Sequence, residues 1–375
     1  MSKTYRVAVI GRTGRGNYGH DLDTVWLDLP EVEIVAVADE AEEGRAQAAE
    51  RLQAPKAYAD YREMLVREKP DLVSVAPRWP DCHCEMTLAC AEAGVRGILM
   101  EKPLARDLQE ADAMLAACER TGMKMAICHQ VRYSPRLAVA RELIASGRLG
   151  DLLELRARGK EDQRGGGEDL MVLGTHLMDL MRFLAGDPHW CFARVTEDGQ
   201  PITPAHVRDG AECLGPLAGD TVTAVYGFTP PLTGTFASHR ARHGANTRYG
   251  LHVLGSKGQL TIHPDGTRLH LREDPSWNPG QSAAAWQPVT SAGVGVPEPL
   301  PEYTLRYGNG LIARDLIRCV EQDRQPLGSV YDGRAALEMI LAVYESHRLS
   351  APVSLPLRDR RHPLSHFSEL SGQVS

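Results

Sequence analysis

The residue best placed for chemistry in this chain is a lysine that follows an apolar strand and precedes a proline. The run Val95-Arg96-Gly97-Ile98-Leu99-Met100 leads directly into Glu101-Lys102-Pro103. Open parallel sheets bind their ligands at the carboxyl ends of the strands, and the ring of Pro103 restricts the backbone that aims the lysine. A lysine that is desolvated there becomes less basic and can take part in proton transfer. We therefore predict that Lys102 acts on a bound substrate. The alternative is a lysine that is merely ion-paired with Glu101.

A second strand pattern, residues 5–10, ends in a glycine-rich turn. Its sequence is Gly11-Arg12-Thr13-Gly14-Arg15-Gly16. Glycines in such a turn allow backbone N–H groups to approach a pyrophosphate at a helix N-terminus. In the dinucleotide-binding pattern G-x-G-x-x-G, Gly11 and Gly16 match, whereas Thr13 takes the central position.

An aspartate supports this interpretation of the turn. Asp39 ends the next strand, 23 residues after Gly16, near the ~20 expected for an acid that binds the adenosine ribose. Its acidic neighbours Glu40, Glu42 and Glu43 should repel the additional phosphate of NADP, so the pattern predicts NAD. The alternative is an ordinary tight turn and an aspartate that caps a helix.

A third group of polar residues lies on an apolar helix pattern. The spacing predicts a helix over residues 169–184, on which His176 and Asp179 are three residues apart and share a face. The carboxylate would then orient the imidazole for acid–base work. The alternative is a histidine that only completes the core.

Composition excludes several classes of protein. With 375 residues, 43% hydrophobic and 24% charged, the chain is typical of a globular protein of two domains. A net charge of −7 offers no basic field for nucleic acid. We find neither a signal-peptide pattern nor an apolar run of the ~18 residues that a membrane span needs.

The cysteines indicate the compartment. Eight cysteines are scattered through apolar stretches, which favours reduced core thiols in a cytoplasmic protein over a disulfide framework. Cys82, His83 and Cys84 are consecutive, whereas zinc ligands are usually spaced by two or more residues, so we predict no metal site there.

The first third of the chain alternates between strands and helices. Expected strands cover residues 6–10, 33–38, 72–76, 96–100 and 124–129, and expected helices cover 42–52, 61–68, 85–93 and 108–121. Short, nearly all-apolar strands separated by helices predict a parallel sheet covered on both faces. We therefore predict an α/β protein whose residues 1–128 form a Rossmann domain with a doubly wound parallel sheet.

The rest of the chain has a different pattern. Expected helices cover 135–146, 169–184, 310–322 and 334–349, and expected strands cover 152–158, 191–196, 220–228, 232–239, 251–254, 259–262 and 268–271. Residues 275–301, rich in Pro, Gly and Ser, indicate a long surface loop. We predict an α+β domain with a large, open, mainly antiparallel sheet over residues 129–357, followed by a polar tail over 358–375.

Taken together, these motifs resemble the glucose-fructose oxidoreductase / inositol dehydrogenase / rhizopine-catabolism family, known as Gfo/Idh/MocA. The resemblance runs from about Lys3 to about Leu357. It rests on Gly11 to Gly16, Asp39, Glu101-Lys102-Pro103, His129 to Pro135, Gly174 to Asp179 and the Gly255 to Gly258 turn.

The resemblance implies NAD(P)-dependent oxidation or reduction of sugars and cyclitols. It implies that Lys102 contacts both nicotinamide and substrate, often with a cis bond to Pro103, and that His176 is the acid/base. It also implies an open C-terminal sheet that forms homo-oligomer contacts, giving a dimer or tetramer. We expect the remaining cofactor contacts from Gly11, Arg12, Thr13, Gly14, Gly16, Asp39, Pro77, His83 and Glu101, and substrate contacts from Arg132, Tyr133 and Asp179.

One position departs from the family pattern. Dehydrogenases of the family usually carry Asp-x-Gly-x-His, and Val172 stands here in place of the aspartate. Asp169 lies seven residues before His176, roughly 10.5 Å along a helix axis, so it replaces the missing carboxylate only if the backbone is rearranged. Three hypotheses follow: an NAD-dependent dehydrogenase, a lyase or hydrolase that uses NAD for a transient oxidation, and a nucleotide or sugar sensor without turnover.

Overall fold

The computed structural model describes residues 4–240, 247–276, 278 and 280–367. The chain forms two compact units, which we call unit 1 and unit 2. Unit 1 contains Met1–Gln130, Ala211–Gly215 and Thr304–Arg334, and unit 2 contains Val131–Gly210, Pro216–Tyr303 and Ala335–Ser375.

A parallel sheet forms the centre of unit 1. Its strands are β1 (Tyr5–Ile10), β2 (Val32–Ala38), β3 (Ala57–Tyr58), β4 (Leu72–Val75), β5 (Gly97–Met100) and β6 (Lys124–Ile127), in the order β3-β2-β1-β4-β5-β6. Every neighbouring pair is parallel. The strand order reverses between β1 and β4, and ligands of such sheets bind outside the carboxyl ends of the strands at this switch point. The predicted Rossmann topology is confirmed.

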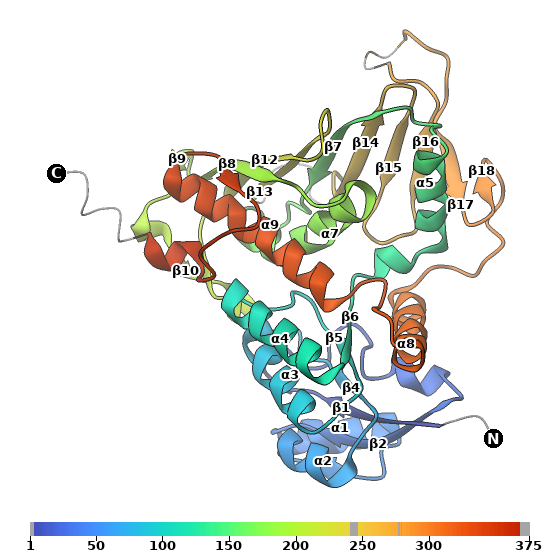
Figure 1. The fold of residues 1–375 in the computed structure, drawn as a ribbon, viewed down its shortest axis with the longest axis vertical. Helices are drawn as coiled ribbons and strands as arrows, with labels where there is room; N and C mark the ends of the chain where they lie inside the picture. Colours follow the sequence, from blue (N-terminus) through green and yellow to red (C-terminus); the bar gives the residue numbers. More distant parts are fainter. Residues whose placement is uncertain (1–3, 241–246, 277, 279, 368–375) are drawn as a thin grey trace. The chain divides into compact units, whose positions relative to one another are not determined.

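Helices cover both faces of this sheet. They are α1 (Glu42–Leu52), α2 (Tyr61–Glu68), α3 (His83–Glu92), α4 (Leu108–Thr121) and α8 (Leu305–Gln322). Figure 1 shows α8 on the opposite side of the sheet from α3 and α4. The segment after α8 also covers the edge strand β6, because the Ile127 N–H donates to the Gly328 carbonyl at 2.8 Å and Ala126 pairs with Ser329.

The segment after β1 differs from the expectation. Between Gly11 and β2, all of it within the described chain, turns lead to a short 3-10 helix, η1 (Val25–Asp28), and no α-helix forms. The prediction that a helix begins directly after the glycine turn is therefore wrong. Gly16 (φ 88°), His20 (φ 47°) and Asp21 (φ 62°) are left-handed, and this conformation cannot continue a right-handed helix.

Unit 2 is built on a mixed sheet in which only β7 and β13 pair in parallel among the described strands. The main path runs β18-β17-β16-β15-β14-β7-β13-β12-β8-β19. The strands are β7 (Leu152–Arg158), β8 (Trp190–Glu197), β12 (Thr221–Gly227), β13 (Thr233–His239), β14 (Gly250–Gly255), β15 (Gln259–Ile262), β16 (Leu269–Arg272), β17 (Gln287–Thr290), β18 (Gly293–Val294) and β19 (Val353–Ser354). The predicted open, mainly antiparallel sheet is confirmed. However, β17 and β18 lie within the predicted 275–301 loop, because their alternation is too short to be recognised.

Helices α5 (Pro135–Ala145), α6 (Gly167–Val172), α7 (Gly174–Ala185) and α9 (Val330–Leu349) complete the second half of the chain. The single helix predicted over 169–184 is broken at Leu173 into α6 and α7. The Leu173 carbonyl accepts a hydrogen bond from Tyr249 Oη at 3.2 Å. Tyr249 directly precedes β14, so a partner that is distant in sequence bonds to the residue where the helix breaks. His176 and Asp179 therefore lie on α7, separated from Asp169.

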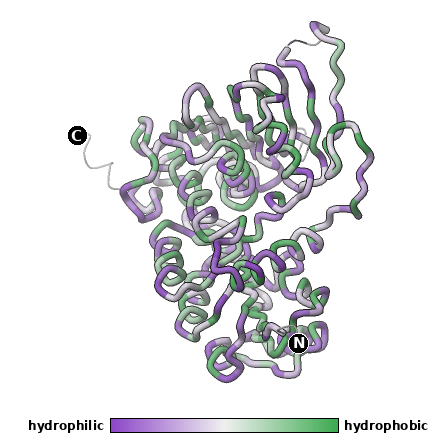
Figure 2. The backbone as a smooth tube through the Cα atoms, turned by 45° about the vertical axis from the view of Figure 1, so that its right-hand side comes forward, coloured by the Kyte–Doolittle hydropathy of each residue, from purple (hydrophilic) through white to green (hydrophobic). Residues whose placement is uncertain are grey.

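Hydrophobic and hydrophilic stretches alternate along the described chain (Figure 2). Among the described residues, no helix combines the length and the apolar character needed to cross a membrane.

Candidate functional site

The glycine turn of unit 1 is fastened by its own backbone. The Arg12 N–H donates to the Asn17 carbonyl at 3.2 Å, and the Asn17 N–H donates back to the Arg12 carbonyl at 2.9 Å. Gly14 (φ 81°) and Gly16 (φ 88°) are left-handed. A Cβ at Gly16 would lie 2.8 Å from the backbone nitrogen of Trp79, so only glycine allows the turn to approach the β4–α3 loop this closely.

Asp39 is held at the end of β2 by the turn. Its Oδ2 accepts from the Thr13 N–H at 3.0 Å and from Thr13 Oγ1 at 2.7 Å, and its Oδ1 accepts from the Ala41 N–H at 3.0 Å. The Thr13 side chain in turn fills the space above Gly44 of α1, where a Cβ would lie 1.9 Å from Thr13 Oγ1. Thr13, the departure from the glycine pattern, thus links the turn to Asp39.

Three buried polar atoms beside the turn lack a partner. Within the described chain, Arg12 Nε, Tyr18 Oη and Asp81 Oδ1 make no hydrogen bond. Burial raises the pKa of Tyr18 first, and the nearby Asp39 carboxylate raises it further, so the phenol keeps its proton. A donor, a hydroxyl and an acceptor without partners match the phosphate and ribose groups of a dinucleotide. The residues present therefore fit NAD.

Lys102 lies at the carboxyl end of β5, where it is only 7% exposed, and its bond to Pro103 is cis. Glu101 holds this position, since its Oε2 accepts from the Lys102 N–H at 2.6 Å and its Oε1 pairs with His20 Nδ1. Burial raises the pKa of Glu101, but the opposing charges of His20 and Lys102 are stronger and leave it lowered. Glu101 is therefore an anion that is hydrogen-bonded to the backbone of Lys102.

His83 supports the same loop from the N-terminus of α3. Its Nε2 lies 2.7 Å from the Pro77 carbonyl oxygen, and its Nδ1 lies 3.1 Å from that of Pro103 and 3.2 Å from that of Leu104. The ring is fully buried. It therefore joins the end of β4 to the loop that carries Lys102.

In unit 2, Asp179 is engaged by an arginine. Its Oδ2 accepts from Arg132 Nε at 2.7 Å, and the guanidinium lies 4.8 Å from the centre of the Phe183 ring. Arg132 and Asp179 are both buried, and His176 is 9% exposed on the same helix. Tyr133 follows Arg132 in a short 3-10 helix. The structure thus brings Arg132 and Asp179 together, and α7 carries His176.

The Asp169 carboxylate does not take the place of the aspartate that Val172 replaces. Val172 is buried on α6. Asp169 Oδ2 accepts from the Glu161 N–H at 3.1 Å and from Ser238 Oγ at 2.5 Å. Burial raises the pKa of Asp169. This carboxylate fastens a loop to β13.

His20 and Arg78 are functional candidates that the sequence reasoning missed. His20 lies four residues after the glycine-rich turn, and Arg78 follows Pro77, so their positions near recognised motifs were the available signal. Only the fold shows that His20 meets Glu101, 81 residues away in sequence.

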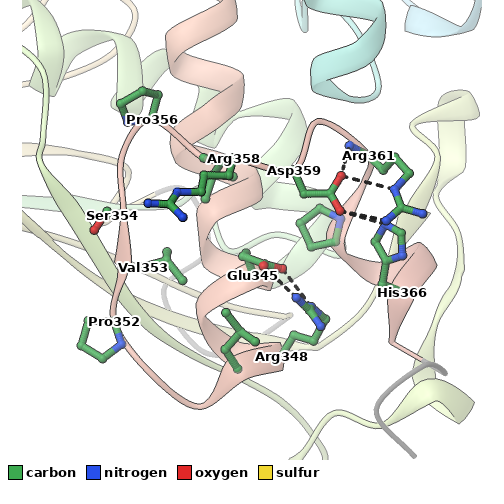
Figure 3. A pocket seen from close by; sticks show the side chains of 13 residues that line it. Glu345, Arg348, Pro352, Val353, Ser354, Pro356, Arg358, Asp359, Arg361 and His366 are labelled. Carbon is green, nitrogen blue, oxygen red and sulfur yellow. Dashed lines mark hydrogen bonds and ion pairs between the residues drawn. The ribbon is translucent and has the colours of Figure 1, made fainter.

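A separate cavity lies at the C-terminal end of α9. It has a volume of about 390 Å³ and none of the predicted site residues lines it. Figure 3 shows Arg348 turned toward Glu345, and Arg361 and His366 turned toward Asp359. These charges neutralise one another, which is consistent with a role in fastening the C-terminal segment.

Comparison with known proteins decides the family. The oxidoreductase family model with an NAD-binding Rossmann fold matches residues 5–129, and the GFO/IDH/MocA C-terminal domain matches residues 137–261. A myo-inositol dehydrogenase of Streptomyces leeuwenhoekii is 30% identical over 271 residues, 70% of this chain and 77% of that protein. The chain belongs to the Gfo/Idh/MocA family.

Other members of the Gfo/Idh/MocA family match over most of their length. A D-apiose dehydrogenase of Paraburkholderia graminis is 27% identical over 372 residues, covering 96% of this chain and 92% of that protein. A levoglucosan dehydrogenase of Pseudarthrobacter phenanthrenivorans is 25% identical over 358 residues, covering 88% and 90%. The solved complex of levoglucosan dehydrogenase with NADH and levoglucosan shares the fold, with a TM-score of 0.75 at 20% identity over 95% of this chain and 100% of that one. The predicted family, NAD as cofactor and the oxidoreductase class are confirmed.

Proposed function

We propose that this protein is a dehydrogenase that transfers a hydride between NAD and a secondary alcohol of a sugar, sugar derivative or cyclitol. The carrying observation is Lys102, a buried lysine at the end of β5 in the unit whose glycine turn and Asp39 fit the dinucleotide. The substrates named for the relatives, levoglucosan, apiose and myo-inositol, support a polyhydroxylated substrate.

Each site residue has a distinct task in this proposal. NAD, when bound, supplies the hydride acceptor. Lys102 donates a hydrogen bond to the substrate hydroxyl oxygen and stabilises the charge that develops on it. His176 accepts the hydroxyl proton, and Arg132, Tyr133 and Asp179 contact the sugar. Gly11, Arg12, Thr13, Gly14, Gly16 and Asp39 hold the dinucleotide, with Pro77, His83 and Glu101 at the loop that carries Lys102.

A panel of sugars and cyclitols mixed with pure protein and NAD tests the reaction class. Accumulation of NADH absorbance with oxidised product supports a dehydrogenase. Product without NADH would indicate a lyase or hydrolase with transient oxidation, and binding without product would indicate a sensor.

Variants test the residues once a substrate is found. Lys102→Ala and His176→Ala should each lower turnover by about 10²- to 10⁴-fold, as expected for a positioned acid/base group, while NADH affinity changes much less. Their double variant should lose less than the product of the two, because groups that act as one unit are not additive. Wild-type turnover in both single variants would exclude them from the mechanism.

The division of labour along the chain is also proposed. Residues 1–128 bind NAD, and residues 129–357 bind the substrate and form homodimer or tetramer contacts through the open sheet. Residues 358–375 are the C-terminal tail; His362 and Leu364 in it are buried, and residues 368–375 lie outside the described residues. On that sheet Trp190 is 37% exposed and Phe192 is 45% exposed. Light scattering measures the molar mass of the wild type and of Phe192→Glu. The carboxylate that this change places on the open sheet should disrupt the assembly and lower the measured mass.

We place the protein in the cytoplasm, where its eight free cysteines stay reduced.

A further inference from the structure

The dinucleotide turn of this chain lacks the usual source of positive charge. In Rossmann domains the pyrophosphate lies at a helix N-terminus, which provides roughly half a positive charge and free N–H groups. Here the described residues between Gly11 and β2 contain turns and η1 but no α-helix. The negative pyrophosphate must therefore be neutralised by another group.

Arginine side chains gather at this turn from two loops. Arg12 and Arg15 belong to the turn itself and donate to the same oxygen, Asp81 Oδ2, at 3.1 and 2.9 Å. Arg78 follows β4, and its N–H donates to the Gly16 carbonyl at 3.2 Å. The Arg78 side chain is 41% exposed, and its Nη2 lies 3.9 Å from Glu212 Oε1.

The hydrogen bonding of this cluster is incomplete in a way that points to an anion. Two guanidinium groups share one carboxylate oxygen, and the buried donor Arg12 Nε has no hydrogen-bond partner in the described chain. The other oxygen, Asp81 Oδ1, also has no partner there, but it is an acceptor, so only the Arg12 donor points to an anion. An unsatisfied buried donor is costly. Guanidinium groups bind phosphate through paired, charge-assisted hydrogen bonds, and a phosphate oxygen is an acceptor of the kind that Arg12 Nε lacks.

We propose that Arg12, Arg15 and Arg78 bind the NAD pyrophosphate and replace the missing helix N-terminus. Asp81 holds Arg12 and Arg15 toward the turn and shares their donors with the phosphates when NAD binds. This rests on NAD as the cofactor and deepens the proposed function by naming the side chains that hold its charged centre.

Binding measurements on Arg15→Gln and Arg78→Gln test the proposal without relying on turnover. Both side chains are partly exposed, so their loss should leave the fold intact. Each variant should bind NADH and ADP-ribose about tenfold more weakly, which corresponds to about 1.4 kcal/mol. Adenosine, which lacks the pyrophosphate, should compete equally well with the wild type and both variants. Arg62→Gln is the matched control, because Arg62 is an exposed arginine of the same unit, paired with Glu85 on α3.

Salt dependence provides a second readout. Raising the NaCl concentration should weaken NADH binding to the wild type more steeply than binding to either variant, since each variant has lost one phosphate contact. Arg15→Lys, which keeps the charge, should recover part of the affinity. Unchanged NADH affinity and salt dependence in both variants would overturn the proposal, and so would an equal loss of adenosine binding. Failure of the wild type to bind NADH would instead overturn the cofactor assignment.

Discussion

Gly44→Ala should destabilise unit 1, although the same change inside an ordinary helix stabilises the helix by about 1 kcal/mol. The new Cβ would lie 1.9 Å from Thr13 Oγ1 and 2.5 Å from Thr13 Cβ. Overpacking costs about 1–3 kcal/mol, and an overlap with three atoms of Thr13 favours the upper end. If Thr13 rotates away instead, it loses its bond to the Asp39 carboxylate, worth about 1.5–3 kcal/mol. At the upper end of either range, and after the gain of about 1 kcal/mol in helix propensity is subtracted, the net loss is about 2 kcal/mol, or roughly 4–8 °C in the unfolding temperature of a unit this size.

Thr13→Gly provides the decisive background for this test. The three atoms nearest to the new Cβ, all within 3 Å, belong to the Thr13 side chain, so removing that side chain should relieve the clash. Gly44→Ala should then stabilise the protein by up to about 1 kcal/mol. Scanning calorimetry of the four proteins measures the coupling, which should be about 3 kcal/mol. Stabilisation by Gly44→Ala in the wild type, or a cost that persists in the Thr13→Gly background, would refute the reasoning.

Three further changes probe other contacts. Asp39→Ala should raise the dissociation constant of NADH by about tenfold, which reduces the ratio by which the protein prefers NADH to NADPH. Titration with both nucleotides measures this ratio, and an unchanged ratio would contradict the prediction. His83→Ala should release the loop that carries Lys102 and lower turnover at least about tenfold, while the affinity for NADH stays within about twofold of the wild type. Equal losses of turnover and of NADH affinity would instead indicate that His83 contacts the cofactor directly. Burial lowers the pKa of His362 to about 4, so the folded state resists its protonation. Above pH ~6.5 this histidine is neutral in both the folded and the unfolded state. As pH falls from ~6.5 to about 4, the unfolded chain binds the proton first, so the free energy of unfolding decreases by up to about 3 kcal/mol. His362→Asn keeps a side-chain acceptor for the Leu364 N–H and should flatten thermal stability between pH 4 and 7 relative to the wild type; matching pH profiles would contradict this.

The helices and strands of unit 1 were predictable because the sequence pattern of each segment matches the environment that the segment has in the fold. Strands such as β4 and β5 are buried at every position, so their apolar runs are unbroken. Helices α2 and α4 begin after Asp60 and Asp107, whose side chains cap them. Each of these segments carries its own start and stop information.

The rest depends on partners that are distant in sequence. The break before α7 has Tyr249 bonded to the Leu173 carbonyl, 76 residues away. His20 meets Glu101 only after the sheet has formed. Spacing alone identified Lys102 as the residue for chemistry. It did not predict that the carboxylate of Glu101 pairs with His20, because no local pattern records a contact between a strand end and a turn 81 residues away.

The cover on β6 has a consequence for how this protein is made. The Ile127 N–H pairs with the Gly328 carbonyl, which is synthesised about 200 residues later, after about 10–40 s at the usual rate of translation. During that interval the NAD-binding sheet has an open edge, and open edges recruit other strands. Nascent chains thus expose this edge to aggregation after β6 is complete and until the segment with Gly328, which follows α8, emerges. A fragment intended to bind NAD alone therefore needs residues 304–334 joined to residues 1–130.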